Sequence, residues 1–327
     1  MVDVIFADSS LKPYASSNDV TLDWAEGASE NDFELSMNDL TPTIGDWFWI
    51  DGTGIGGHIS DRKVTVSGGV SASTWSGPTW TGMLSDKILT PDSGKDYLTL
   101  TGDASTVVQQ LVNRSKLNGV FTVKAGESNP QVSYTFQDPR FPDAYTALTS
   151  MLASAGMKPV FTCSDNRILL SPEPVTTVSN TVDSDIVDFT VETANRRTNH
   201  LIGLGKGALK DRVLVHWYAD KDGNVSQKQS LFGADEVTET YECSNADAAE
   251  LNQKTRDKLV QAQSGGSVDV DLDDGTAIAI KVGDRVVAAD MQSGVSVAAK
   301  VTKRIAKIAN GVLTITYEVG DASSRRM

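Results

Sequence analysis

The sequence predicts a mainly β protein in which two small antiparallel β-barrel domains flank a region that also contains helices. Three observations lead to this fold class. Short segments of alternating apolar and polar residues fill the first hundred positions, as in strands that bury one face. Two stretches with apolar residues at helical spacing follow. A second series of short strand-like segments, separated by glycines, occupies the last third.

The N-terminal segments predict the first barrel. Turn signals at Asp51-Gly52, Gly56-Gly57 and Gly68-Gly69 separate them at short intervals, which favours a barrel or a sandwich. The predicted strands are 2–6, 20–24, 33–37, 47–50 and 62–66.

Tryptophans concentrate in the same region: Trp24, Trp47, Trp49 and Trp75, with Trp80 close behind. Such an aromatic cluster is usually part of a core. The alternative is a platform on which sugar rings stack, which would make this sheet a carbohydrate-binding module.

The middle region predicts two helices. Asp103 is placed to cap a helix from Ala104 to Lys116. A second helix is predicted from Pro142 or Asp143 to Ala155, with Gly156 as its C-cap. Further predicted segments are two extended stretches, 120–123 and 159–163, and a loop or linker at 172–184.

Residues 199–225 predict a hairpin. Gly203, Gly205 and Gly207 alternate, which leaves one side of an extended segment without side chains and suits the close approach of another segment. The run 213–219 is rich in β-branched and aromatic residues, and Asp222-Gly223 turns it into a strand from about Val225.

The last third predicts one helix and then strands. Ser244 is the expected cap, with Asp247 three residues later, and the helix is expected to end at 264–266. The predicted strands are 268–272, 277–281, 285–289, 295–305 and 312–319. Their glycine-marked turns are typical of a small antiparallel barrel.

These elements divide the chain into three expected domains. Residues 1–100 form the N-terminal barrel, completed by residues 195–240, and residues 101–194 form an α+β middle domain. Residues 241–327 supply a helix and the second barrel. A chain of 327 residues is long enough for two or three cores.

Charge limits the function classes. With 29 basic and 43 acidic residues, the net charge is −14. A surface this acidic is unsuited to holding DNA, because phosphate binding needs clustered Lys and Arg. Acidic side chains that line a passage could still let DNA through without adhesion. The simpler reading is that they keep the surface soluble.

Cys163 and Cys243 lie 80 residues apart and outside any CxxC pattern. We expect buried thiols and neither a metal site nor a disulfide framework. No apolar run approaches the ~20 residues of a membrane span, and the N-terminus lacks a signal-peptide layout. Synthesis and folding are therefore expected in a cytoplasm.

Three motifs resemble functional sites, and each favours a structural interpretation. Residues 52–57 satisfy GxGxxG, but a strand-like segment follows where a dinucleotide site needs a helix. His58, His200 and His216 are scattered, without HExxH spacing. Residues 220–224 imitate the start of a calcium loop but lack its continuation, so a hairpin turn is the better account, with a weak cation site left open.

The stretch 199–226 resembles the corresponding segment of tail-hub proteins of long-tailed bacteriophages. This family includes Gp37-like siphophage proteins and the hubs at the tube tip of contractile tails and tailocins, all related to the gp27-type baseplate hub. Further similar stretches are Trp75–Leu84, Tyr97–Asp103 and Val282–Val286. None of these stretches carries chemistry.

The resemblance implies a gp27-like architecture and a virion protein at the tail tip or baseplate. It implies a homotrimer whose two barrels per subunit form a pseudo-sixfold ring matching the sixfold tube. The implied partners are the distal tail or tube protein, the tape-measure protein and tip, fibre or receptor-binding proteins, with DNA only in transit during genome ejection. It implies no catalytic residue, no cofactor and no metal.

Two alternatives stay open at this point. One is a cell-wall hydrolase that acts through carboxylates among the many acidic residues, although no dyad can be singled out. The other is the carbohydrate-binding module on the tryptophan-rich sheet. The sequence does not distinguish contractile from non-contractile tails, a phage from a tailocin, or lumen-facing residues from others.

Overall fold

The computed structural model describes residues 2–28, 30–180, 187–191, 198–221, 223–244, 246–263, 268–272, 280–290 and 295–326. The chain divides into two compact units. Unit 1 comprises Met1–Asp188, Val270–Val287 and Lys300–Glu318, and unit 2 comprises Phe189–Asp269, Ala288–Ala299 and Val319–Met327.

A small four-stranded antiparallel sheet begins unit 1, with strand order β2-β1-β5-β6. Its strands are β1 (Val4–Ala7), β2 (Pro13–Ser17), β5 (Trp47–Trp49) and β6 (Gly56–His58). Short strands with glycine-rich turns were predicted here, and the β5–β6 hairpin confirms the turn reading of residues 52–57.

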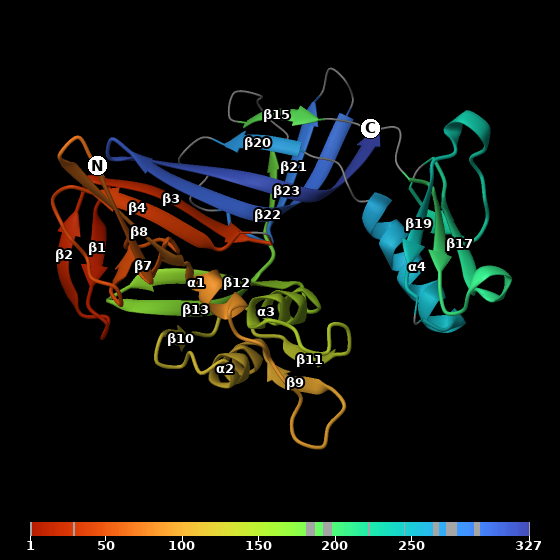
Figure 1. The fold of residues 1–327 in the computed structure, drawn as a ribbon, viewed down its shortest axis with the longest axis horizontal. Helices are drawn as coiled ribbons and strands as arrows, with labels where there is room; N and C mark the ends of the chain where they lie inside the picture. The colour runs from red at the N-terminus through yellow and green to blue at the C-terminus, as the bar shows by residue number, and fades with distance from the viewer. Residues whose placement is uncertain are drawn as a thin grey trace. The chain divides into compact units, whose positions relative to one another are not determined.

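The largest sheet, most of whose residues belong to unit 1, combines strands from both ends of the chain in the order β23-β22-β3-β4-β8-β7 (Figure 1). The bounds are β3 (Val20–Gly27), β4 (Asp32–Met37), β7 (Asp61–Ser67), β8 (Val70–Pro78), β22 (Val295–Ala309) and β23 (Val312–Arg326). Strand β21 (Arg285–Asp290) pairs with β22 and with β14 (Thr177–Asn180). The same sheet includes β15 (Val187–Val191) and β20 (Val268–Leu272).

The middle of the chain supplies three helices and two further sheets to unit 1. The helices are α1 (Trp80–Ser85), α2 (Ala104–Arg114) and α3 (Ala144–Ala153). A two-stranded antiparallel sheet consists of β9 (Leu98–Asp103) and β11 (Gln131–Phe136). A three-stranded sheet has the order β10-β13-β12, with β10 (Phe121–Val123), β12 (Met157–Ser164) and β13 (Arg167–Pro174).

The two predicted helices are confirmed, and Asp103 caps α2 as predicted. The predicted C-cap of α3 is wrong: the helix ends at Ala153 with Ser154 as its C-cap, and Gly156, with φ +70°, follows two residues later. An Asp103 carboxylate oxygen accepts a hydrogen bond from the Thr106 amide at 2.9 Å, and Asp143 does the same for the Thr146 amide at 2.8 Å. The apolar stripes of both helices are buried in one core with the β5 tryptophans, because each stripe spans one face. The predicted linker at 172–184 is partly strand, since β13 extends to Pro174 and β14 follows, while 181–186 lie outside the described residues.

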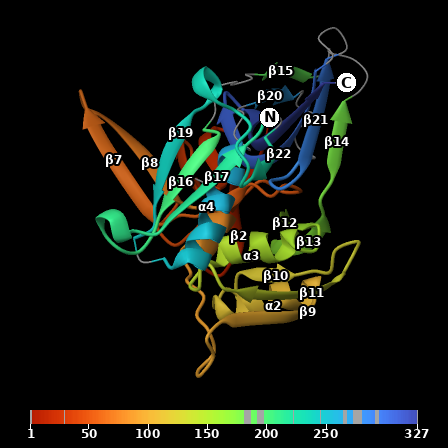
Figure 2. The ribbon, with the colours of Figure 1, turned by 90° about the vertical axis from the view of Figure 1, so that its right-hand side faces the viewer.

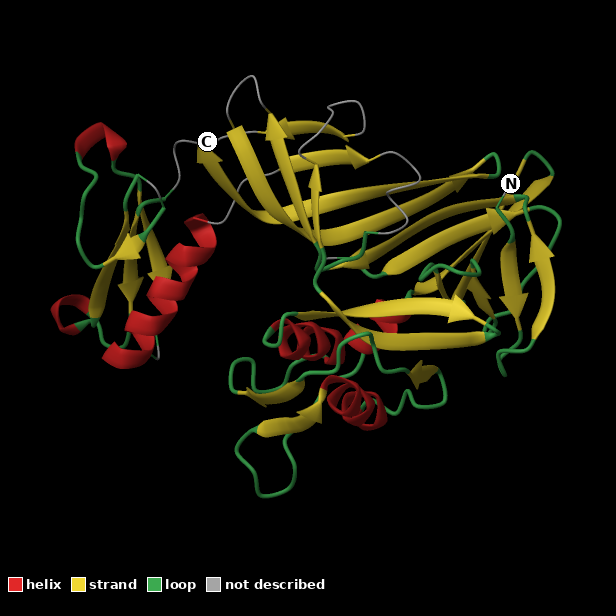
Figure 3. Ribbon diagram, turned by 180° about the vertical axis from the view of Figure 1, so that it is seen from behind, coloured by secondary structure: helices red, strands yellow, loops and turns green. Residues whose placement is uncertain are grey.

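Unit 2 contains a four-stranded sheet with α4 along one face (Figure 3). Its elements are β16 (His200–Leu204), β17 (Leu214–Ala219), β18 (Val225–Ser226), β19 (Thr238–Glu242) and α4 (Ala248–Gln263), with 3₁₀ turns η1 (Leu209–Asp211) and η2 (Gly233–Asp235). The predicted hairpin is confirmed as β17–β18.

Two details of unit 2 correct the expectations. Strand β19 runs parallel to β16, whereas an antiparallel arrangement was expected. The cap of α4 is Asp247 and not Ser244, because the helix begins one residue after Asp247. An Asp247 oxygen accepts from the Ala249 and Glu250 amides at 3.0 Å, while the Ser244 hydroxyl donates to Glu242. The expected helix end at 264–266 lies outside the described residues.

The fold class is mainly β with a helix-containing middle region, as predicted. The described strand pairings form open strand orders, without a closed circuit among them. The two units divide the chain differently from the three predicted domains, because β22 pairs with β3 and residues 200–242 form a sheet of their own. The predicted strand at 277–281 falls mainly in the undescribed residues 273–279. Among the described residues, no helix combines the length and apolar composition that a membrane crossing requires.

The alternate glycines of β16 allow α4 to pack closely, as their spacing suggested. A Cβ at Gly203 would overlap Thr255 Oγ1 and lie 2.8 Å from Val215 Cγ2, and a Cβ at Gly205 would lie 2.8 Å from Leu251 Cδ2. Thr255 and Leu251 are both buried on α4. The glycines therefore set the distance between helix and sheet.

Gly203→Ala should destabilise unit 2 by about 1–3 kcal/mol, since overpacking a close contact costs that much. Gly119→Ala is the matched control, because a Cβ there meets nothing within 4 Å. We expect the control to be neutral or slightly stabilising. Urea unfolding followed by far-ultraviolet circular dichroism measures both variants, and equal midpoints for the two would contradict the packing argument.

Candidate functional site

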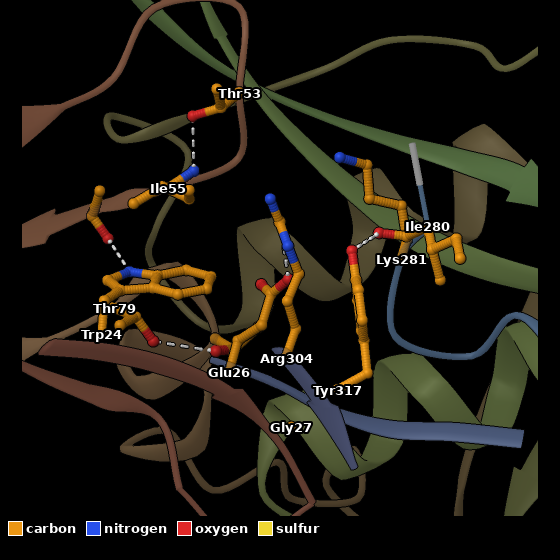
Figure 4. A network of polar contacts seen from close by, with 12 residues as sticks. Trp24, Glu26, Gly27, Thr53, Ile55, Thr79, Ile280, Lys281, Arg304 and Tyr317 are labelled. Atoms are coloured by element: carbon orange, nitrogen blue, oxygen red, sulfur yellow. Dashed lines mark hydrogen bonds and ion pairs between the residues drawn. The ribbon is translucent and has the colours of Figure 1, made fainter. Parts of the chain in front are cut away.

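The most heavily buried charges lie in unit 1, where β3 pairs with β22. Arg304 stands opposite Glu26 in the antiparallel register, and Arg304 Nη1 lies 3.3 Å from Glu26 Oε1 (Figure 4). Arg304 is 0% exposed and its guanidinium carbon lies 5.6 Å from the Trp24 ring centroid. Two residues along β3 from Glu26, the Trp24 indole donates to the Gly56 carbonyl at 3.0 Å. An ion pair and a ring contact thus fix Arg304 inside the sheet.

A small cavity adjoins this ion pair. Its volume is about 10 Å³, the space of roughly one water molecule. Glu26, Lys281 and Arg304 line it together with Thr81, Tyr145, Val282 and residues 159–161. Among the described residues, Arg304 Nε and Nη2 have no hydrogen-bond partner. The cavity has charged groups but no room for a sugar or a peptide.

The protonation of these groups reflects their burial. Burial, and then the positive charge of Arg304, lowers the pKa of Lys281 to about 8. Burial raises the pKa of Glu26, and the charges of Arg304 and Lys281 oppose that shift. Burial disfavours the charged forms of both Glu26 and Lys281, so the ion pair between Glu26 and Arg304 adds little net stability by electrostatics alone. The strand register and the ring of Trp24 hold Arg304 in place.

A second buried ion pair gives the stretch 282–286 a structural role. The Asp284 carboxylate pairs with the Lys158 ammonium, and both side chains are buried. It also accepts from the Thr176 amide at 2.8 Å and the Lys281 amide at 2.9 Å. Gly283 has φ +98°, a conformation that favours glycine. Asp284 therefore ties β12, the start of β14 and the turn before β21 together.

The histidines are scattered in sequence, but the structure brings two of them together in unit 2. His200 on β16 and His216 on β17 lie 2.9 Å apart between Nε2 and Nδ1. His200 Nδ1 lies 2.7 Å from Glu236 Oε1, and its ring stacks on Tyr218 at 4.4 Å between centroids. This carboxylate–imidazole–imidazole chain ends at the exposed His216. The pairing register of β16 with β17 brings the two histidines together, and no spacing motif in the sequence indicates it.

His58, the third histidine, packs separately against Trp47, with 4.5 Å between ring centroids. Burial lowers its pKa. Among the described residues, no three His, Cys, Asp or Glu side chains gather in a way that could hold a metal ion.

The remaining sequence candidates have structural roles. All five N-terminal tryptophans are buried, so Trp47 and Trp49 offer no exposed face for a sugar. Asp220 accepts hydrogen bonds from the amide and side chain of Asn224 across the β17–β18 turn, whose Asp222 lies outside the described residues. Both cysteines are free, and burial raises the pKa of the Cys163 thiol.

Among the residues whose burial the structure describes, the most exposed extended element is the hairpin formed by β7 and β8, which Figure 2 shows as a two-stranded ribbon. Residues 61–72 are all exposed, on both strands and at the tip. Val64, Val66 and Val70 are 51%, 70% and 72% exposed. The sequence predicts the first strand and the turn, but it does not indicate that both lack a covering layer.

Solved structures with the same fold include phage tail proteins. The 43 kDa tail protein of prophage MuSo2 from Shewanella oneidensis has a TM-score of 0.56 at 12% identity, with 97% of this chain and 98% of that chain covered. The tail protein from Neisseria meningitidis MC58 has 0.52 at 17% identity, covering 98% and 97%. Prophage tail protein gp18 from Listeria monocytogenes EGD-e has 0.51 at 11% identity, covering 98% and 95%.

Comparison of the sequence with models of known protein families and with curated proteins finds no match. The fold of this chain is thus that of phage tail proteins over nearly its whole length.

Arg304→Met should destabilise unit 1 by roughly 3–5 kcal/mol, because it leaves Glu26 buried without its partner. Lys307→Met is the matched control: it lies three residues along β22 and also pairs with a β3 carboxylate, Asp23, but both side chains are 60% exposed. The control should cost at most ~1 kcal/mol. Guanidinium unfolding measures the difference, and similar losses would show that burial of the pair is unimportant.

Stability should depend on pH through Lys281. The folded chain releases this proton near pH 8 and the unfolded chain near 10.5. Between these values the unfolded state binds more protons, so this residue's contribution to the unfolding free energy rises with pH. Wild type should gain stability relative to Lys281→Met between pH 8 and pH 10 in urea titrations, with Lys307→Met as the control for removing one lysine. A constant difference would contradict the assignment.

Proposed function

We propose that this chain is a structural protein of a phage-type tail tip or baseplate, a hub that assembles as a homotrimeric ring. In this role the ring closes or narrows the tail tube, joins the sixfold tube to threefold tip proteins, and opens to let the tape measure and DNA leave. The action is mechanical, without a catalytic residue, cofactor or metal. The chain is made in a host cytoplasm and ends in the virion tail.

The observation that carries this proposal is the fold itself. Three solved phage tail proteins share it over at least 97% of this chain at identities of 17% or less. A fold alone does not define a function, since sites are added to folds. Here the similarity spans the whole chain, and the sequence stretches that suggested a hub lie in framework positions, such as Asp284 and the β16 glycines.

Charge supports a passage for DNA. The chain carries 43 acidic and 29 basic residues. Acidic side chains on a ring lumen would repel phosphates and prevent adhesion during transit. The proposed partners are the distal tail or tube protein, the tape-measure protein and the tip or fibre proteins.

The described geometry gives no support to the two alternatives. The cavity beside Glu26 has room for about one water molecule, which is far smaller than the binding site a cell-wall glycan requires. The tryptophans that would bind sugar are buried. A lytic band for the purified chain on a cell-wall zymogram would nevertheless establish a hydrolase and overturn the mechanical role.

Light scattering of the purified chain should give a mass near three times 35.0 kDa, with the trimer fraction rising with concentration. Closed rings of identical subunits have fixed stoichiometry, so no broad series of larger species should appear. A monomer at every concentration, or a dimer, would contradict the ring.

A further inference from the structure

The hairpin β7–β8 lacks the cover that the rest of unit 1 gives its strands. Val64 and Val66 lie on one face of β7, since side chains alternate along a strand. Val70 pairs opposite Ser67, which places it on the other face. The exposed valines therefore leave apolar surface on both faces of a two-stranded ribbon. Such a ribbon is marginal in water unless another surface packs on it.

Strand β7 is also an unprotected sheet edge. It stands at the end of the strand order and pairs with β8 alone. Among the described residues, nothing hydrogen-bonds to its outer backbone edge. Proteins commonly protect such edges with charged residues, proline or bulges. The charges of β7 are confined to its first three residues, and residues 64–73 contain neither a charge nor a proline and pair regularly with each other. The edge is suited to pairing with another chain.

Charge indicates what covers the hairpin. Residues 61–73 carry three charges, Asp61, Arg62 and Lys63, so the hairpin has a net charge of +1. The chain as a whole has a net charge of −14. A surface of opposite sign is therefore available on every other copy of the same chain, and copies that repel one another elsewhere attract at this hairpin.

We propose that residues 61–73 form an arm that packs on the neighbouring copy of this chain. The contact is head to tail: each copy gives one hairpin and receives one, and a rotation that closes produces a ring. The proposal rests on the proposed homotrimer and adds the surface that holds it together. The apolar tip supplies buried area, and Arg62 and Lys63 at the base supply attraction that salt weakens.

A matched pair of double variants tests the arm. Val66→Lys/Val70→Lys places two charges on the hairpin, and Ile44→Lys/Val312→Lys places two on equally apolar sites of unit 1 that are each 59% exposed. We expect the hairpin variant to need at least tenfold more protein for assembly, measured by light scattering against concentration. The control should assemble like wild type. Circular dichroism and melting curves show that both variants fold.

The outcomes separate the arm from the trimer. If the hairpin variant assembles like wild type, or if the control loses assembly equally, the arm is wrong and the trimer stands. If wild type is a monomer at all concentrations, both are wrong.

A photoreactive residue maps the contact directly. Benzoylphenylalanine at Val70 in the purified chain should give a two-chain product on illumination, in lower yield at high salt, whereas the same residue at Val312 should not. No product at Val70, or a product only with a different tail protein in assembled tails, would overturn the assignment to a second copy.

Discussion

The buried contact between Glu26 and Arg304 joins two ends of the chain that are 278 residues apart in sequence. It fixes the register of β3 against β22, because a slip of one residue would move Arg304 to the opposite face of the sheet. Gly27 allows the strands to approach, with its φ of +152° and its missing Cβ beside the Thr302 carbonyl. The neighbouring Lys303, on the other face, pairs with Glu30 and Glu318. The sheet that carries the hairpin β7–β8 depends on this pairing.

This arrangement also explains what sequence patterns could and could not predict. Local signals located α2 and α3, because Asp103 and Asp143 cap helices whose apolar stripes are continuous. The Gly203–Gly205 spacing predicted a close approach that α4 makes. Strand partners are not local: nothing in residues 295–309 indicates that they pair with β3 and not with their own neighbours alone. The division into domains therefore differed from the two units of the structure.

The same contrast between local and non-local signals applies to the candidate site residues. Interpretations that depend on a single local segment are confirmed: residues 52–57 lie at the β5–β6 hairpin, and the N-terminal tryptophans are part of the core. The groups that pairing brings together were not foreseeable, since His200 and His216 meet through a hairpin register and Lys158 meets Asp284 across 126 residues. The exposed hairpin was visible only as a strand and a turn, because a sequence does not show which strand lacks a neighbour.

These features agree with the mechanical role proposed above. The cavity beside its buried charges has space for about one water molecule, its described surface has an uncovered hairpin, and its fold occurs in phage tail proteins of very different sequence. The most direct measurement is an electron cryo-microscopy reconstruction of a tail that contains the chain. The account predicts three copies around the tail axis, with each hairpin seated on the next copy. Copies away from that axis, or hairpins that touch no other copy, would contradict it.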